Sequence, residues 1–381
     1  MVRPRATILG IGEADGGKAT GRGGVELGAE AALRAVADAG LELDEVDGLL
    51  VEAPDVDQHH MAQLALADAL AWRPRFAYST GCGGATPIAN VLLAVAAIEA
   101  GLAERVLLVD YDARQTRRSP DRSQRLARTA GHRNLWEDPY GPITAAKFAL
   151  VARAHMDRYG TTRRQLAEIT VQARRNGSLR EGAQLRTPVT VEEVLASPPI
   201  AEPLHLLDCC IVSDWGSAVL LARPDPGASR GVKVVGMGQG HEGYAITRAE
   251  SLAAFPAIAA SGRQAFAMAD IGPADVDLAL VYDSFTITLL VTLENLGFCE
   301  IGSGGTFVGE GRIGPQGTLP VNPHGGQLAY GGGHGHFLTE AVRQLRGEAP
   351  TAQVGGARVA LCQGTAAAVL SSYTVILEAA A

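Results

Sequence analysis

Apolar and polar positions follow two patterns along the first 112 residues, and these patterns alternate in a regular order. Short apolar runs bounded by glycine or charge predict buried strands, whereas apolar residues that recur every three or four positions predict helices. The segment 86–100 is apolar nearly all round, which is typical of a buried helix. The predicted strands are 6–12, 48–52, 76–84 and 105–112, and the predicted helices are 26–39, 60–71 and 86–100. This alternation indicates a layered α/β protein with a mainly parallel sheet.

The pattern changes in the middle of the chain, where we expect an excursion at about 113–185. Residues 113–142 are polar and rich in arginine. We interpret them as a long loop, either a solvated surface or a guanidinium patch for a phosphate group, such as that of a coenzyme A nucleotide. Helices are predicted at 143–158 and 162–175. The stretch 186–225 is predicted to run from a loop with a short helix into a strand.

The second half of the chain repeats the first. The segment DAGLELDEVDGLLV (38–51) resembles DIGPADVDLALVYD (270–283), with Asp47 matching Asp277. Further on, each half has a glycine turn, a helix and a strand, and the last of these strands start at residues 105 and 358. Two copies of one unit in the same order indicate an internal duplication, with equivalent glycine turns around one pseudo-twofold site. The predicted halves are residues 1–225 and 226–381.

Composition excludes several classes of protein. The 381 residues are 47% hydrophobic and 19% charged, which excludes a disordered chain. The net charge of −8 argues against nucleic-acid or anionic-membrane binding, and no apolar run reaches the roughly 18–20 residues that span a bilayer. Five cysteines without a C-x-x-C pair predict neither a disulfide framework nor a zinc site, and they fit a reducing cytoplasm. The first residues are interpreted as a strand and turn, not as a signal peptide.

Three motifs carry a resemblance to a known family. IANVLLAVAAIEAGLAERVLLV (88–109), NPHGG (322–326) and LCQGT (361–365) resemble the nucleophile-loop helix and two glycine motifs of the thiolase superfamily. The longer segments 202–214, 281–308 and 324–347 resemble its sterol-carrier-type, lipid-transfer-annotated branch. The resemblance implies a thiolase-like α/β fold, with duplicated βαβαβ-type halves in α-β-α-β-α layers.

The catalytic positions implied by this resemblance are mostly changed. The nucleophilic cysteine position falls on Gly84, two residues after Cys82, and the catalytic histidine position falls on Gly332. The Asn or His position of a further thiolase motif falls on Tyr282 in VYDSF (281–285), and only Cys362 keeps its residue type. Because no cysteine stands at the nucleophile position, no thiolate there can carry the acyl group as a covalent intermediate. The pattern therefore resembles the actinobacterial steroid side-chain aldolases, which lack the nucleophile and use tyrosines.

The reaction that this resemblance implies is retro-aldol cleavage of a bulky β-hydroxyacyl-CoA, possibly a steroid side-chain thioester, into a ketone and a short acyl-CoA. Tyr282 matches the first catalytic tyrosine of these aldolases and is the first candidate for the acid/base. Their second tyrosine falls on Gly332, so Tyr330 or His334 is predicted to replace it. Asp283, His324 and His334 are candidates for the base or for a neighbour of Tyr282. The glycine turns are expected to hold the enolate oxygen through backbone N–H groups. Their residues are Gly84, Gly325, Gly326 and Gly332.

Two other functions stay open. One is a thiolase or acyltransferase that uses Cys82 and Cys362, and the other is a non-catalytic subunit that binds acyl-CoA or lipid. No metal is predicted, because His334 and His336 have no evident third ligand. Coenzyme A is expected only as part of the substrate, with no covalently bound cofactor. The resemblance also implies a homodimer and a separate small partner with a zinc ribbon and an OB-fold. Loops around 53–60, 113–142 and 236–262 are expected to line the acyl tunnel.

Overall fold

The computed structural model describes residues 4–56, 59–118, 137–224, 227, 229–350 and 352–380 of the chain. Its main feature is one nine-stranded mixed sheet in the order β3-β2-β4-β7-β1-β8-β11-β10-β9. The strands of this sheet are β1 (Ala6–Glu13), β2 (Gly48–Glu52), β3 (Phe76–Thr80), β4 (Arg105–Ala113), β7 (Asp214–Ala222), β8 (Val232–His241), β9 (Leu278–Val281), β10 (Val359–Ala366) and β11 (Ser371–Glu378). A separate hairpin pairs β5 (Pro199–Ala201) with β6 (Leu204–His205).

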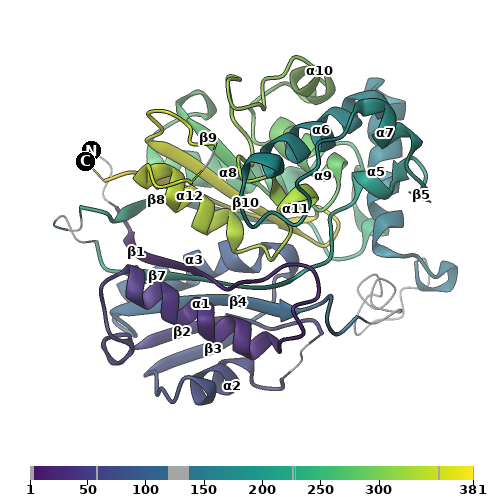
Figure 1. Cartoon of the computed structure of the whole chain (residues 1–381). Coiled ribbons are helices and arrows are strands. Elements are labelled where there is room, and N and C mark those ends of the chain that lie inside the picture. The colour runs from purple at the N-terminus through teal and green to yellow at the C-terminus, as the bar shows by residue number, and fades with distance from the viewer. Residues whose placement is uncertain are drawn as a thin grey trace.

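Helices cover the sheet and fill the space between its two halves (Figure 1). They are α1 (Gly24–Asp38), α2 (Ala62–Ala69), α3 (Thr86–Glu99), α5 (Thr144–Tyr159), α6 (Arg163–Leu179), α7 (Val191–Ala196), α8 (Pro256–Ala269), α9 (Thr286–Asn295), α10 (Gly304–Gly309), α11 (Gly326–Ala329) and α12 (His336–Arg346). Among the described helices, none is long and apolar enough to cross a membrane.

The strand order repeats about the centre of the sheet. Moving outward from the centre, the first half has β1, β7, β4 and β2, and the second half has β8, β11, β10 and β9. The two halves join where β1 pairs with β8 antiparallel, with Ala6 opposite Val234 and Ile8 opposite Val232. The expected duplication is thus visible in the topology, while the division at residue 225 stays a prediction.

Asp47 and Asp277, which match in the sequence repeat, make the same contact in each half. The carboxylate of Asp47 accepts a hydrogen bond from the backbone N–H of Arg105 (2.9 Å), and that of Asp277 accepts one from Arg358 (2.8 Å). Each aspartate therefore ties the start of one strand to its parallel neighbour. This shared contact explains why Asp47 and Asp277 match in the sequence repeat.

Glycines let a helix pack directly on a strand in both halves. A Cβ atom at Gly12 in β1 would lie 2.1 Å from the carbonyl oxygen of Ala31 in α1. A Cβ atom at Gly238 in β8 would lie 2.0 Å from that of Ser261 in α8. Only glycine permits such a close backbone approach. The glycine spacing in β1 and β8 is therefore a packing requirement and not a nucleotide-binding motif.

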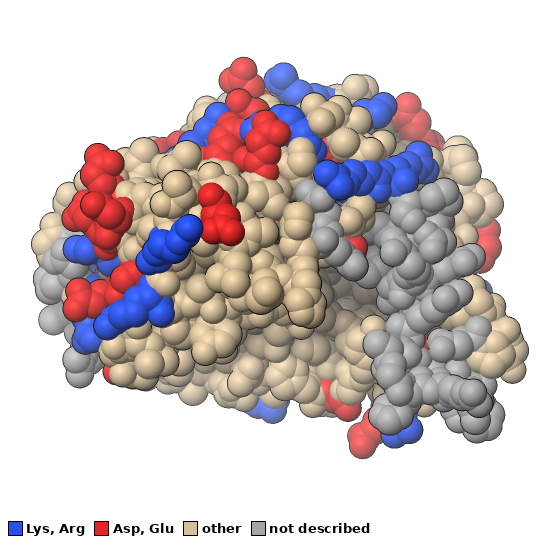
Figure 2. Space-filling model, turned by 90° about the horizontal axis from the view of Figure 1, so that it is seen from below, with Lys and Arg blue, Asp and Glu red and all other residues tan. Residues whose placement is uncertain are grey.

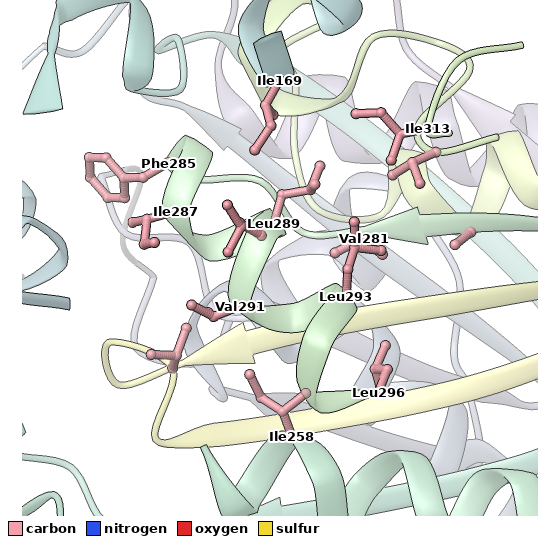
Figure 3. Packing of buried hydrophobic residues seen from close by; sticks show 14 of the residues in the cluster. Ile169, Ile258, Val281, Phe285, Ile287, Leu289, Val291, Leu293, Leu296 and Ile313 are labelled. Carbon is pink, nitrogen blue, oxygen red and sulfur yellow. The ribbon is translucent and has the colours of Figure 1, made fainter. Parts of the chain in front are cut away.

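The core has three apolar layers. Residues of α3 and α12 form the central layer with the inward faces of strands from both halves. Under α1 and α2 lies a second layer, and α5, α6, α8 and α9 contribute to a third. Figure 3 shows this third layer, where Leu289, Val291 and Leu293 of α9 lie among Val281, Ile169 and Ile258. These layers confirm the expected α-β-α-β-α arrangement.

Two expectations about the elements are wrong. The sheet is not mainly parallel, because only β2–β3, β2–β4 and β9–β10 are parallel and the other five neighbouring pairs are antiparallel. The segment 236–262 is not a loop, because it contains most of β8 and half of α8. Most of the arginine-rich stretch 113–142 lies outside the described residues.

Candidate active site

Tyr282 lies at the carboxyl end of β9, where its backbone N–H donates to the carbonyl oxygen of Gln363 in β10 (3.1 Å). Its phenol reaches the glycine turn that leads into α3. A Cβ atom at Gly84 would lie 2.7 Å from the hydroxyl oxygen of Tyr282 and 2.6 Å from its ring. Tyr282 therefore fills the space that a side chain at position 84, such as a cysteine, would need.

Two cavities meet at Tyr282. The first, which we call the histidine cavity, has a volume of about 310 Å³ and is lined by His334, Ser213, Trp215, Gln327 and Gly332 together with a largely apolar wall. The second, which we call the cysteine cavity, has a volume of about 510 Å³ and is lined by Cys82, Gly84, Lys147, His241 and Tyr373 among others. Tyr282, Thr144 and Phe148 line both, so the two cavities adjoin.

His334 is the histidine that contacts Tyr282. The two rings meet edge to face, with their centroids 5.0 Å apart. His334 is buried, and its Nδ1 lies 3.8 Å from a carboxylate oxygen of Glu52. Beside Glu52 lies Asp110, which accepts hydrogen bonds from the indole of Trp215 and from the backbone N–H of Gly335, both at 2.9 Å.

Burial sets the protonation of these groups. It raises the pKa of Tyr282, so its phenol stays protonated and acts as a hydrogen-bond donor, not as a base. Burial also raises the pKa of Glu52 and of Asp110 to about 7. The charge of Glu52 raises the pKa of Asp110 further, whereas a hydrogen bond from Asp110 lowers the pKa of Glu52. His334 is the group in contact with Tyr282 whose neutral ring carries a basic nitrogen that can accept a proton.

Asp283 has a structural task. Its carboxylate accepts a hydrogen bond from the backbone N–H of Gln327 (2.7 Å) at the start of α11. A Cβ atom at Gly326 would lie 2.1 Å from the same carboxylate, so only glycine fits there. Gly325 is equally constrained, because its Cβ atom would lie 3.0 Å from the backbone of Gly177. These residues hold the turn in place. Asp283 lines neither cavity, and its role as a base stays a prediction.

Tyr330 and His324 belong to a different cluster. The hydroxyl of Tyr330 donates to Glu13 (2.9 Å), which is also bound by Arg343 (2.6 Å). This cluster opens into a third cavity of about 540 Å³, with His336 on its wall. The ring of His336 fills the space beside Gly332, 2.4 Å from a Cβ atom at that position.

His324 packs against Tyr330 and Phe337, and burial lowers its pKa well below the usual value. Neither His324 nor Tyr330 lines a cavity that contains Tyr282. Of the two candidates for the second catalytic tyrosine, it is His334 that contacts Tyr282, whereas Tyr330 lines a different cavity.

The cysteines do not form a thiolase pair. Cys362 is fully buried in the central layer, with its sulfur 3.8 Å from the carbonyl oxygen of Phe337, and burial raises the pKa of its thiol. Cys82 lines the cysteine cavity and accepts a hydrogen bond from the hydroxyl of Tyr373 (3.4 Å). Because Cys362 reaches neither cavity, the expected two-cysteine arrangement is absent from the described residues.

Sequence reasoning missed Glu52, Asp110 and Trp215. Glu52 and Asp110 each stand in an apolar run, LLVEA and RVLLVDYD, that was interpreted only as a buried strand. An acidic residue inside a buried strand needs a partner or a function, and that signal points to both residues. Trp215 lies in β7 and carries no comparable signal.

Comparisons with known proteins agree with this site. Residues 238–379 match the family described as thiolase C-terminal domain-like. The chain is 34% identical over 363 residues to a steroid side-chain-cleaving aldolase of Thermomonospora curvata, covering 90% of both chains. It is 35% identical over 380 residues to 17-hydroxy-3-oxo-4-pregnene-20-carboxyl-CoA lyase of Mycobacterium tuberculosis, covering 96% and 97%. An acetyl-CoA acetyltransferase of Methanothermobacter thermautotrophicus is 33% identical, covering 87% and 88%.

Solved structures show the same relation. The structure titled Ltp2-ChsH2(DUF35) aldolase superposes with a TM-score of 0.86 at 30% identity, covering 99% of this chain and 98% of that chain. Human mitochondrial 3-ketoacyl-CoA thiolase, at 15% identity and a TM-score of 0.71, shares the fold. The chain therefore belongs to the thiolase superfamily. Within that superfamily it is a carbon–carbon lyase of the aldolase branch, as its residues at positions 84 and 282 indicated.

Proposed function

We propose that the protein cleaves a bulky β-hydroxyacyl-CoA by a retro-aldol reaction, releasing a ketone and a shorter acyl-CoA. The observation that carries this proposal is the phenol of Tyr282 in the space of the missing nucleophile. A steroid side-chain thioester is the proposed substrate class, because the relative from Mycobacterium tuberculosis is named for the 17-hydroxy-3-oxo-4-pregnene-20-carboxyl-CoA that it cleaves.

The geometry assigns a role to each of two residues. His334 takes the β-hydroxyl proton, the Cα–Cβ bond breaks, and its electron pair moves into the thioester to form an enolate. Tyr282 donates a hydrogen bond to the enolate oxygen, in a site next to the N-terminus of α3, where the helix dipole also favours negative charge. The proton on His334 then returns to Cα, so the enzyme ends the cycle unchanged.

The two cavities suit the two ends of such a substrate. Apolar side chains line the histidine cavity, which fits the bulky acyl group. They are Ile143, Phe148, Ile200, Leu206, Val212 and Phe285. The cysteine cavity contains the glycine turn at Gly84 and is proposed to hold the thioester and the adjoining part of coenzyme A. No covalently bound cofactor is needed for this chemistry, and a cytoplasmic location stays part of the proposal.

Replacing Tyr282 by phenylalanine tests this function directly. In Tyr282→Phe we expect kcat for 17-hydroxy-3-oxo-4-pregnene-20-carboxyl-CoA to fall at least about 100-fold, because the enolate loses its donor. Affinity for the thioester, measured by calorimetry, should stay the same because the ring remains. Tyr159→Phe, outside both cavities, is the matched control and should keep full activity.

Three results would contradict the proposal. Full activity of Tyr282→Phe would remove the role of the phenol. An acyl adduct on Cys82, seen by intact-protein mass spectrometry after incubation with acyl-CoA, would favour the acyltransferase alternative. Binding of the thioester by the wild-type protein without any turnover, alone or with a partner, would favour a non-catalytic subunit.

We further propose that the protein forms a homodimer through β3 and works with a separate small protein. β3 is an edge strand, and Tyr78 at its centre is 59% exposed. The face seen from below, which holds α2 and β3, has a broad area without charged side chains (Figure 2). The related aldolase structure is titled as a pair, Ltp2 with ChsH2(DUF35), which supports a partner here. A zinc ribbon and an OB-fold in that partner stay a proposal from family resemblance.

A further inference from the structure

We infer that Glu52 and Asp110 share a single proton behind His334, and that this pair acts as a positioning device for the base. The inference rests on the proposed function and assigns roles to two residues that do not touch the substrate. Neither carboxyl group lines the histidine or the cysteine cavity. Their effect on the reaction therefore passes through His334.

The sheet register brings the two acids together. β2 and β4 are parallel neighbours with Val51 opposite Val109, so Glu52 and Asp110 are the next residues on each strand. Side chains alternate between the two faces of a strand. Val51 and Val109 belong to the outer layer under α1, whereas Leu50 and Leu108 belong to the central layer. Glu52 and Asp110 thus face the same side as Leu50 and Leu108, toward the central layer that contains α12.

The surroundings of the pair favour one proton and one negative charge. Glu52 is 6% exposed and Asp110 is 4% exposed, and the two carboxyl groups lie within hydrogen-bonding reach of each other. Two adjacent buried carboxyl groups do not both ionise, since each charge opposes the other. The charged and titratable groups that face the pair are His334, His336, Arg114, Asp112 and Asp55.

Arg114 does not neutralise the pair alone, because its guanidinium donates to Asp112 (3.0 Å) and lies 3.6 Å from Asp55. A shared proton removes one of the two negative charges at no cost in volume. A metal ion would be the other way to join two carboxyl groups and a histidine whose atoms lie within 4.8 Å of one another. Both oxygens of Asp110 already accept N–H donors, from Trp215 and Gly335, which favours the proton.

The remaining single charge suits the proposed reaction. When His334 takes the β-hydroxyl proton it becomes an imidazolium, with Nδ1 3.8 Å from Glu52. One negative charge at that distance stabilises the imidazolium, and the same proton later returns to Cα. The proton between Glu52 and Asp110 is not consumed. The pair holds the ring toward Tyr282 and sets its basicity, as a carboxylate does for a catalytic histidine in other enzymes.

Two single variants test the shared proton. In Glu52→Gln and in Asp110→Asn, one carboxyl group remains without a negative neighbour, so it ionises at lower pH. We expect the infrared difference spectrum at neutral pH, wild type minus variant, to contain the C=O band of a protonated carboxyl group in both cases. The pH profile of kcat for 17-hydroxy-3-oxo-4-pregnene-20-carboxyl-CoA should lose an ionisation near neutral pH, and kcat should fall about tenfold.

Glu294→Gln is the matched control. Glu294 also forms a buried pair with a histidine, His155, at 2.9 Å, but lies outside the three cavities. It should change neither the pH profile nor that infrared band, even if the variant is less stable. Circular dichroism of every variant separates loss of folding from loss of the pair.

Three outcomes would overturn the inference. A protonated band that persists in Asp110→Asn would mean that Glu52 is protonated by itself and nothing is shared. Stoichiometric metal in the purified wild-type protein, lost in both variants, would replace the proton by an ion. Unchanged pH profiles in active variants would remove the positioning role. If the wild-type protein has no turnover, the proposed function and this catalytic role both fail, and the infrared result still decides the shared proton.

Discussion

At the scale of single residues, the absence of one side chain decides the chemistry. Gly84 has no side chain, and the space beside it contains the phenol of Tyr282. A cysteine and this tyrosine exclude each other sterically, so one loop position separates covalent acyl transfer from non-covalent enolate chemistry. Only the helix α3 separates Gly84 from the end of the motif at Gly101, and the phenol of Tyr282 lies beside that position.

Gly84→Ala tests this exclusion with one added carbon atom. The new Cβ would lie 2.7 Å from the hydroxyl oxygen of Tyr282, so the phenol must move, and we expect kcat to fall at least about tenfold. Gly355→Ala is the control, because a Cβ atom there meets open space and should leave the steady-state rate unchanged. Wild-type activity in Gly84→Ala would show that the position of the phenol is not important.

The candidate site was only partly predictable from the sequence. Tyr282 and His334 were both candidates because they stand in motifs. Asp283, His324 and Tyr330 stand in the same motifs. Only the fold shows that Asp283 binds α11, that Tyr330 lines the third cavity and that His324 packs against Tyr330 and Phe337. The acid pair depends on strand register, which becomes visible only when β2 and β4 are placed side by side.

At the scale of elements, strands and helices with strong periodicity were predicted well. The strands 6–12, 48–52 and 105–112 are confirmed almost to the residue, as is the buried helix α3. The parallel pattern was wrong because β7 and β11 enter the sheet antiparallel to their neighbours. Periodicity within a segment carries no information on the direction of the strand that pairs with it.

One buried carboxylate connects two loops to the start of β7. Asp214 accepts hydrogen bonds from the backbone N–H groups of Thr20, Gln115 and Thr116 (2.8, 2.8 and 2.9 Å). Burial by itself would raise the pKa of Asp214, but these bonds and one from the Thr116 hydroxyl lower it overall. A lowered pKa in the folded state means that the ionised form stabilises the fold.

Asp214→Asn should therefore lower the free energy of unfolding at pH 7 by about 2–3 kcal/mol. The stabilisation is complete above the unfolded pKa of about 4 and is lost as the pH falls through the lower folded value, so the gap between wild type and variant should shrink in acid. Urea unfolding at pH 7 and at pH 3 measures both values. Asp157→Asn, at an exposed helical pair, should cost less than about 0.5 kcal/mol, and an equal loss in both variants would contradict the argument.

At the scale of the whole molecule, the edge strand β3 is the feature that predicts assembly. Tyr78→Lys places a charge at the centre of this strand, and a charged edge opposes pairing with another sheet. We expect the wild-type protein to sediment as a dimer and Tyr78→Lys as a monomer at micromolar concentration. Tyr140→Lys, at a tyrosine that is 83% exposed elsewhere, should remain dimeric. Sedimentation of the wild-type protein as a monomer would contradict the dimer proposal.

The antiparallel pair of β1 and β8 has a consequence for how substrates are selected. Through this seam the sheet is continuous, and α3 and α12 contact strands of both halves. The residues proposed for catalysis come from opposite sides of the seam, with Gly84 and Glu52 in one half and Tyr282 and His334 in the other. A hinge opening between the halves would break the main-chain hydrogen bonds between β1 and β8 and separate the side chains of the central apolar layer. We therefore expect the two halves to keep a fixed arrangement, so that the proposed thioester substrate is selected by its fit to a preformed site and not by domain closure.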